Sequence, residues 1–282
     1  MTVQEIKKEI VKRLTSTVGF GEAEAMMRMM MHDILGMTPI DMALHPDRTV
    51  ENFTQHRLSG ICRRIINGEP IQYVLGHAQF HGLDIKVSPA VLIPRPETSE
   101  LVDIISDRAN GSPDLRVCDL CTGSGCIALA LGRSLVYPQI TAVDNSPEAL
   151  DIAAENARML NLDINFVDTD VLRLQAPVIP AYDIIVSNPP YVAESEKKDM
   201  DARVLDNEPP AALFVPDSDP LIFYRAISQY ALGALVSGGS LYFEINPLFA
   251  GKLHTMLVDD GWTDTQIIRD YRGKNRFAIC QR

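Results

Sequence analysis

Hydrophobic residues in the first quarter of the chain recur at helical spacing. Ile6, Ile10 and Leu14 lie four residues apart, which places them on one face of a helix. A methionine-rich stretch from 23 to 35 ends at Gly36, and a third periodic stretch, 49–66, is followed by a glycine at 68, the residue that commonly follows a helix. The pattern predicts helices throughout residues 2–68, with the methionines acting mainly as core filler.

The pattern then changes to alternation. From 71 to 95 apolar and polar residues alternate, beginning with Tyr73-Val74-Leu75, and His81-Gly82 interrupts them as a two-residue turn. This predicts a β-hairpin, which is followed by the stiff connector Pro94-Arg95-Pro96. We divide the chain into a helical domain (1–70), a hairpin linker (71–96) and a catalytic domain (97–282).

From Leu115 onward, strand-like and helix-like segments alternate, which is typical of an α/β fold with a parallel sheet. The predicted strands are 116–120, 139–143, 164–167, 182–187 and 240–245, with a terminal strand pair at 264–270 and 276–280; the predicted helices are 124–135, 147–160, 220–236 and 247–260. The expected fold is a doubly wound, mostly parallel, seven-stranded Rossmann-like sheet behind a small helical domain and a hairpin linker.

Charge and composition narrow the function. The net charge is −11, and residues 1–80 contribute none of it because they hold nine Lys/Arg and nine Asp/Glu. An acidic chain argues against a nucleic-acid partner held by phosphate contacts. No apolar run is long enough to span a bilayer, and the first residues resemble neither a signal nor a transit peptide, so we expect a cytoplasmic protein without membrane attachment. The single Cys118-x-x-Cys121 has no partner pair nearby, which argues against a metal or redox site.

The most informative motif is an apolar strand, 184–187, that runs into Asn188-Pro189-Pro190-Tyr191. The two prolines forbid continuation of the strand, so they form a rigid corner at its carboxyl end, where open α/β sheets bind ligands. The Asn188 side chain and the Pro189 carbonyl offer two hydrogen-bond acceptors and no base. They suit a substrate –NH2 group that is held and oriented. The plainer interpretation is a Pro-Pro turn with an Asn cap.

A glycine-containing turn follows the first strand of the sheet. Gly123 and Gly125 permit a tight strand-to-helix turn, and Asp144 ends the next strand at the distance expected for a carboxylate that binds a ribose diol. The same spacing satisfies a permissive dinucleotide fingerprint, so a nicotinamide oxidoreductase remains an alternative. S-adenosylmethionine is favoured because Asp119 can order an ammonium group, directly or through water, but repels a pyrophosphate. The Asn188–Tyr191 corner also favours S-adenosylmethionine, because hydride transfer does not require a site for an –NH2 group.

Together these motifs resemble a class I S-adenosylmethionine-dependent methyltransferase that acts on a planar –NH2 group, and within that class the peptide chain release factor N(5)-glutamine methyltransferases, over nearly the whole length. The segments that carry the resemblance are 119–125, Asp144, Asp170, 188–191, 69–73, 92–98 and 208–213. The chain departs from the family pattern in three places: Cys121 replaces a glycine, Ser99 replaces a frequent carboxylate, and Val171 replaces an aromatic residue near the adenine.

The resemblance implies methyl transfer to the glutamine of a Gly-Gly-Gln motif in a peptide chain release factor, with S-adenosylhomocysteine as product and no metal. It implies cofactor binding by Cys121, Thr122, Gly123, Ser124, Gly125, Asp144, Asp170, Val171 and Asn188, catalysis by Asn188, Pro189 and Tyr191, and substrate binding by these three with Pro190. Tyr191 is expected to pack against the flat amide. The helical domain is the expected docking surface, with part of Met26–Met31 facing the partner, and the protein is expected to be a monomer. Alternatives are a ribosomal-protein glutamine methyltransferase, a DNA adenine-N6 methyltransferase, or a cofactor-binding protein without activity.

Overall fold

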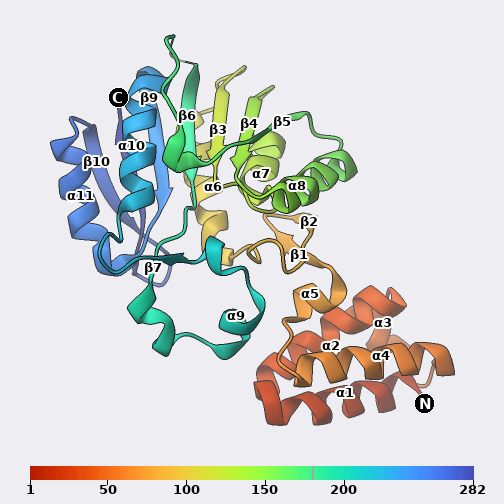
Figure 1. Cartoon of the computed structure of the whole chain (residues 1–282). Coiled ribbons are helices and arrows are strands. Elements are labelled where there is room, and N and C mark those ends of the chain that lie inside the picture. Colours follow the sequence, from red (N-terminus) through yellow and green to blue (C-terminus); the bar gives the residue numbers. More distant parts are fainter. Residues whose placement is uncertain (180) are drawn as a thin grey trace. The chain divides into compact units, whose positions relative to one another are not determined.

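The computed structural model of the chain describes residues 1–179 and 181–282, which form two compact units (Figure 1). The first, here the helical unit, consists of residues 1–76 together with 201–207. The second, the catalytic unit, consists of residues 77–200 and 208–282. These bounds differ from the predicted division, because the first unit continues to Gly76 and takes in a short segment from far along the chain.

The helical unit is built around a methionine-rich core. Its helices are α1 (Val3–Val18), α2 (Phe20–Leu35), α3 (Pro39–Leu44), α4 (Asn52–Ile66), α5 (Ile71–Leu75) and α9 (Ala202–Asn207). Thr2 and Glu5 form a capping box that starts α1, and Gly36 ends α2 in the left-handed conformation, as its position in the sequence predicts. The predicted helices of residues 2–68 are therefore confirmed.

Two expectations for this unit are corrected. Met26, Met27, Met30 and Met31 are at most 7% exposed, so these four fill the core and do not face a partner, while Met29 is half-buried. Residues 73–75 lie in helix α5, whose C-cap Gly76 has φ +87°, and not in a strand. Only three residues made up the alternating pattern there, which is too short to distinguish one helical turn from a strand.

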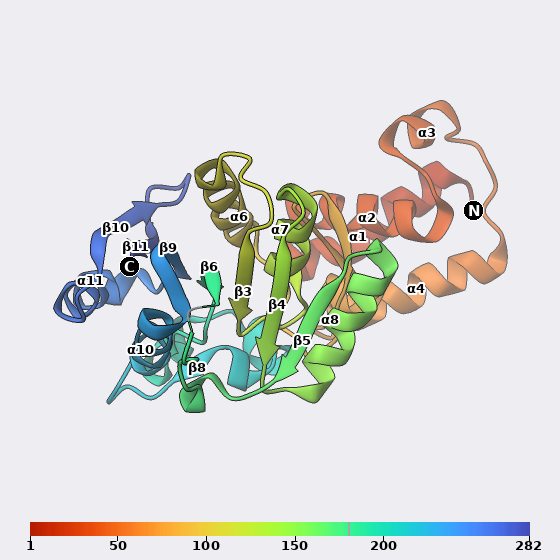
Figure 2. The same cartoon turned by 90° about the horizontal axis from the view of Figure 1, so that it is seen from above.

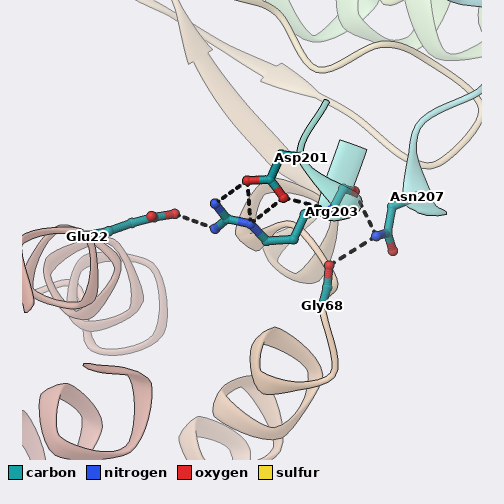
Figure 3. A network of polar contacts seen from close by, with 5 residues as sticks. All are labelled: Glu22, Gly68, Asp201, Arg203 and Asn207. Atoms are coloured by element: carbon teal, nitrogen blue, oxygen red, sulfur yellow. Dashed lines mark hydrogen bonds and ion pairs between the residues drawn. The ribbon is translucent and has the colours of Figure 1, made fainter. Parts of the chain in front are cut away.

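A segment from beyond residue 200 completes the helical unit (Figure 3). The Arg203 guanidinium donates to Glu22 Oε1 (2.6 Å) and to Asp201 Oδ2 (2.8 Å). The Asn207 amide donates to the Gly68 carbonyl (3.0 Å), which ties the end of α9 to the turn after α4. The helical unit is thus held together by residues some 140–180 positions apart.

The catalytic unit contains a seven-stranded sheet with the order β10-β11-β9-β6-β3-β4-β5. Its strands are β3 (Arg116–Leu120), β4 (Gln139–Asp144), β5 (Ile164–Asp168), β6 (Tyr182–Ser187), β9 (Leu235–Glu244), β10 (Thr263–Arg269) and β11 (Asn275–Gln281). Strands β5, β4, β3, β6 and β9 are parallel, and β11 is antiparallel to both β9 and β10. The predicted mostly parallel sheet and its terminal strand pair are confirmed.

Helices cover both faces of this sheet (Figure 2). Helices α6 (Pro96–Ala109), α7 (Cys126–Ser134) and α8 (Pro147–Leu160) contact one another in series on one face, whereas α10 (Ile222–Ala234) and α11 (Ala250–Asp259) pack on the other. Helix α10 ends at Ala234, two residues before the predicted end, because β9 begins at Leu235. The short 3-10 helices η1 (Val171–Arg173), η2 (Glu194–Asp199), η3 (Pro210–Ala212) and η4 (Pro247–Phe249) and the strand pair β7 (Val192–Ala193) and β8 (Phe214–Val215) fill the connections. No helix in the described part of the chain is long and apolar enough to cross a membrane.

The predicted hairpin is present, but it is shorter than expected. Strands β1 (His77–Phe80) and β2 (Leu83–Lys86) pair across a two-residue turn in which His81 (φ +48°) and Gly82 (φ +75°) both adopt positive φ, as a type I′ turn requires. The hairpin is fastened to α8, because the backbone of Lys86 exchanges two hydrogen bonds with the buried Asn156 side chain. Asn156 also donates to the Ser124 carbonyl (3.0 Å), and so the hairpin indirectly supports the turn after β3.

Candidate active site

A cavity of ≈ 380 Å³ lies at the carboxyl ends of β3, β4 and β6. In doubly wound sheets this is the edge at which ligands bind. The walls come from several parts of the catalytic unit: the loop before α6, the turn after β3, the turn after β4, the start of η1, the segment that follows β6, and helix α10. The residues that argue for a function are Arg95, Thr98, Cys121, Thr122, Gly123, Ser124, Cys126, Asp144, Val171, Asn188, Pro190, Phe214 and Phe223.

The turn after β3 is held by a buried carboxylate. Asp119 Oδ2 accepts hydrogen bonds from the Thr122 hydroxyl (2.6 Å) and from the Ala128 backbone N–H (3.2 Å). Burial raises the pKa of Asp119 to about 7, against the lowering effect of these two bonds. Asp119 is fully buried and does not line the cavity, so its observed contacts are those of a residue that shapes the turn.

Close packing explains the glycine at 125. Gly125 has φ +81°, and a Cβ atom there would lie 3.1 Å from the Cβ of Ala153 on α8.

Cys121 has φ +63°, in the left-handed region that favours glycine, and this is the position where the family pattern has glycine. The chain therefore carries a side chain in a conformation that L-residues rarely adopt.

Asp144 links the ends of β3 and β4. Its Oδ2 accepts from the Gly123 N–H (2.9 Å) and its Oδ1 accepts from the Ser146 N–H (3.0 Å). Burial raises the pKa of this carboxyl, and the hydrogen bonds from the backbone oppose the shift. A carboxylate has about four acceptor sites, so Asp144, which lines the cavity, retains capacity to bind a pair of hydroxyl groups.

The residues present fit the amino-acid and ribose parts of S-adenosylmethionine. Two buried polar atoms at this end, Asp119 Oδ1 and Ser124 Oγ, have no hydrogen-bond partner. Space beside Gly123 is open, since a Cβ there would meet nothing within 4 Å. Val171 is buried and lines the cavity, whereas Asp170 does not line it; Asp170 Oδ1 instead caps η1 by accepting from the Leu172 N–H (2.9 Å).

The Asn-Pro-Pro-Tyr corner begins directly after β6, as the sequence predicts. Asn188 and Pro190 line the cavity, but Pro189 and Tyr191 do not. Instead, Tyr191 packs against the core and its hydroxyl donates to Glu244 Oε1 (3.0 Å). Tyr191 therefore supports the corner from the side of the core. Its ring does not line the cavity, which differs from the expected stacking on a substrate amide.

Sequence reasoning missed the residues that support this corner from elsewhere in the chain. Glu244 ends β9, and it accepts from both Tyr191 and Thr98. Asn246, two residues later, donates to the Tyr191 carbonyl (3.0 Å). The sequence marks Thr98 only as the end of segment 92–98 and gives no local sign of Glu244 or Asn246, because each contact joins segments more than 50 positions apart.

A buried ion pair supports the opposite wall. Glu208 is 3% exposed; it accepts from the Arg95 guanidinium (2.6 Å) and the Ile93 N–H (3.2 Å). Both segments were noted in the sequence only as part of a resemblance, and the ion pair gives them a structural reason. Phe214 and Phe223 add apolar side chains to the lining of the cavity.

The thiols of the site are not nucleophiles. Cys121 and Cys126 line the cavity. Burial raises the pKa of Cys121 far above its usual range and that of Cys126 to about 12, so both remain protonated at neutral pH. The described residues contain no cluster of His, Cys, Asp and Glu that could hold a metal ion.

Two known families match consecutive parts of the chain. Residues 5–76 match the PrmC N-terminal domain, which covers almost the same residues as the first segment of the helical unit. Residues 98–213 match the methyltransferase small domain, which includes the turn after β3 and the corner after β6.

Curated relatives match over nearly the whole length. A release factor glutamine methyltransferase of Bacteroides thetaiotaomicron is 43% identical over 262 residues, which is 93% of each chain. The enzyme of the same name from Flavobacterium psychrophilum is 36% identical over 98% of each chain. That of Streptococcus pneumoniae is 41% identical over 87% of this chain and 86% of its own.

Solved structures share the fold. A 16S rRNA N2 G1207 methyltransferase from T. thermophilus, in complex with AdoMet and guanosine, gives a TM-score of 0.53 at 17% identity, and covers 73% of this chain and 49% of its own. A methyltransferase from Pyrococcus furiosus gives 0.51 at 17% identity, and covers 79% of this chain and 98% of its own. Both likenesses concern the methyltransferase fold alone.

Proposed function

The chain belongs to the release factor glutamine methyltransferases, and from this premise we propose that it transfers the methyl group of S-adenosylmethionine to the side-chain amide nitrogen of the glutamine in a release factor's Gly-Gly-Gln motif. The observation that carries the proposal is that Asn188, a neutral acceptor at the end of β6, lines the same cavity as Asp144 and the turn after β3. One site thus combines groups for the cofactor with groups for a planar –NH2.

The proposed cofactor contacts begin at the turn after β3. Cys121 to Ser124, which line the cavity, surround the amino-acid portion, while Gly125 packs against α8 and holds the turn. Asp144 accepts from the ribose hydroxyls, and Val171 packs near the adenine. Asp170 supports this wall by capping η1. When bound, the cofactor supplies an electrophilic methyl group.

The chain's own residues prepare the acceptor nitrogen. An amide nitrogen is a weak nucleophile, because its lone pair is delocalised into the carbonyl group. In the proposal the Asn188 side-chain oxygen and the Pro189 carbonyl accept from the two N–H groups. They fix the nitrogen in line with the methyl group and stabilise the positive charge that develops on it. Pro190 forms the adjacent wall, and Tyr191 anchors the corner. The carbon–sulfur bond breaks, its electron pair stays on sulfur, and S-adenosylhomocysteine leaves. The methylated amide is strongly acidic while it carries the extra proton, and it releases that proton to water. No histidine or lysine occurs among the described residues that line the cavity, so no side-chain base is assigned to this step.

The protein partner is the less direct part of the proposal. A Gly-Gly-Gln tripeptide offers little surface, so we assign selectivity for a folded release factor to the helical unit, in a monomeric enzyme that works in the cytoplasm. The helical unit exposes several large apolar side chains, among them Phe20, Ile40, Leu44 and Phe53, which are 61–79% exposed. They replace the buried methionines as the candidate contact residues.

The decisive experiment is mass spectrometry of a purified release factor after incubation with the enzyme and S-adenosylmethionine. We expect one added methyl group on the Gly-Gly-Gln glutamine, and none on a factor in which that glutamine is alanine. A glutamine-containing ribosomal protein and an adenine-containing DNA duplex serve as competing substrates. Preferential methylation of either of these, with the release factor unmodified, would contradict the proposal.

A further inference from the structure

We propose that Thr98 and Glu244 form a positioning relay that fixes the orientation of the Asn188 amide, so that its oxygen and not its –NH2 group faces the substrate. This inference rests on the proposed function, because it assigns a task to Asn188. It assigns a role to two residues that have none so far: Thr98 in helix α6, which the sequence marks only as the end of segment 92–98, and Glu244 at the end of β9.

The relay is a chain of three side chains. Asn188 Nδ2 donates to Thr98 Oγ1 over 3.5 Å, and Thr98 Oγ1 donates to Glu244 Oε2 over 2.6 Å. Thr98 and Glu244 are each 1% exposed, so water does not compete for the bond between them, whereas the longer Asn188–Thr98 contact lies at the cavity wall. The other carboxylate oxygen, Oε1, accepts from the Tyr191 hydroxyl (3.0 Å). One carboxylate therefore holds both ends of the Asn188–Tyr191 corner.

The direction of the hydrogen bonds follows from what each group can donate. An ionised carboxylate only accepts, and a threonine hydroxyl has a single hydrogen. The Thr98 hydroxyl donates its hydrogen to Glu244. Toward Asn188 its oxygen can therefore only accept a hydrogen bond. The Asn188 nitrogen consequently faces Thr98, and the Asn188 oxygen is left for the substrate. With its own –NH2 turned toward the substrate, Asn188 would oppose a donor with a donor.

This direction of the hydrogen bonds requires an ionised Glu244, and the groups around Glu244 determine its pKa. Burial raises the pKa of the Glu244 carboxyl, whereas the hydrogen bonds from Thr98 and Tyr191 and the positive charge of Arg276 lower it. Arg276 lies on β11, the strand that pairs with β9, and also binds Asp270 (3.2 Å). Two donors and a nearby cation thus favour the ionised carboxylate and offset part of the effect of burial, which still leaves the pKa of Glu244 raised.

The neighbouring Asn246 supports the corner by a separate route. Its Nδ2 donates to the Tyr191 carbonyl (3.0 Å) and to Glu196 Oε1 (2.8 Å), so the backbone of the corner is held without Glu244. Removing the Thr98 hydroxyl should therefore release the Asn188 amide while the corner itself stays in place. This separation makes the relay testable by a single isosteric substitution.

The test compares Thr98→Val with Thr98→Ser in the full-length enzyme. Thr98→Val keeps the shape of the side chain but removes the hydroxyl, and we expect kcat for release factor methylation to fall about tenfold, which corresponds to one hydrogen bond of about 1.4 kcal/mol. Because Thr98 lies outside the proposed cofactor contacts, the Kd for S-adenosylmethionine, measured by calorimetry, should change less than about twofold. Thr98→Ser should restore most of the activity.

Thr265→Val is the matched control, since the Thr265 hydroxyl on β10 is buried without a partner, and it should leave kcat unchanged.

A double substitution separates positioning from a structural role. If Thr98 acts only through Asn188, Thr98→Val should cause no further loss of kcat in an Asn188→Ala background. Equal losses in both backgrounds, or wild-type kcat in Thr98→Val, would overturn the relay. An inactive wild-type enzyme would instead contradict the proposed function, so the two failures are distinguishable.

Discussion

The turn after β3 and the corner after β6 lie at the same edge of one sheet, yet they are built in opposite ways. The turn is held by residues 3–32 positions away: Asp119 binds Thr122 and Ala128, Asp144 at the end of the adjacent strand binds Gly123, and Asn156 binds Ser124. The corner is held by residues 53–90 positions away, namely Thr98, Glu244 and Asn246. Cofactor binding thus depends on local backbone geometry, and substrate orientation depends on tertiary packing.

This difference predicts separable defects. Substitutions in the turn should change cofactor affinity and the stability of the turn, whereas substitutions in the corner should change turnover while the cofactor still binds. The following predictions test that separation, from the largest expected effect to the smallest.

The largest expected effect is the change of the free energy of unfolding with pH, which arises from the buried carboxyl of Asp119. Its pKa of about 7 in the folded protein, against an ordinary value of 3.8, means that the folded state retains a proton which the unfolded state releases. Stability from this group is therefore complete below about pH 4, is lost as pH rises to about 7, and is constant above that. The loss amounts to about 4 kcal/mol.

Urea unfolding of wild type and Asp119→Asn between pH 4 and pH 8 measures this effect. The asparagine does not titrate, so the difference in unfolding free energy between the two proteins should change by the stated amount across this range. Carboxyls that do not interact with Asp119 titrate equally in both proteins and cancel; the nearby Asp144 adds a smaller difference. Parallel pH profiles would show that Asp119 ionises normally in the folded state.

Asn188→Ala tests the corner directly. Removal of an acceptor that acts mainly in the transition state typically lowers kcat by about 10²–10³. Affinity for S-adenosylmethionine should stay near that of wild type, because Asn188 forms only one part of the cavity wall. Near-normal turnover in this variant would remove Asn188 from the proposed chemistry. A parallel loss of cofactor affinity would contradict the separation of turn and corner.

Asp144→Ala is the converse experiment in the turn. It removes charge-assisted bonds to the ribose, and the Gly123 N–H loses its acceptor as well. We expect S-adenosylmethionine to bind more weakly by about 2 kcal/mol, or roughly 30-fold. With saturating cofactor, kcat should recover most of its wild-type value. In wild type, S-adenosylmethionine should raise Tm and a nicotinamide dinucleotide should not; the opposite result would revive the dinucleotide alternative.

The same contrast explains how much the sequence predicts. All seven strands of the large sheet, the turn at His81-Gly82 and the site of the Asn-Pro-Pro-Tyr corner follow from periodicity and from proline and glycine chemistry, which are local properties. The helix at 71–75, the burial of the methionines and the Thr98–Glu244 contact depend on which segments meet in three dimensions. Tyr191 illustrates the limit: its position next to the prolines was informative, but the direction of its side chain is set by Glu244.

The smallest effect is expected where the chain after the corner enters the helical unit. Residues 201–207 belong to that unit, and Glu208, which follows directly, binds the Arg95 wall of the cavity. Arg203→Ala removes the ion pairs to Glu22 and Asp201 that help hold this segment. These pairs are partly exposed, so each contributes at most about 1 kcal/mol. We expect KM for a full-length release factor to rise about two- to fivefold, because residues 201–207 belong to the helical unit, to which we assign recognition of the folded release factor. Cofactor Kd and activity on a short Gly-Gly-Gln peptide should remain unchanged.

Arg225→Ala is the matched control, because it removes an ion pair to Asp219 of similar exposure within the catalytic unit. It should leave KM for the release factor unaltered. An equal rise in KM for both variants would show that the effect is not specific to the helical unit.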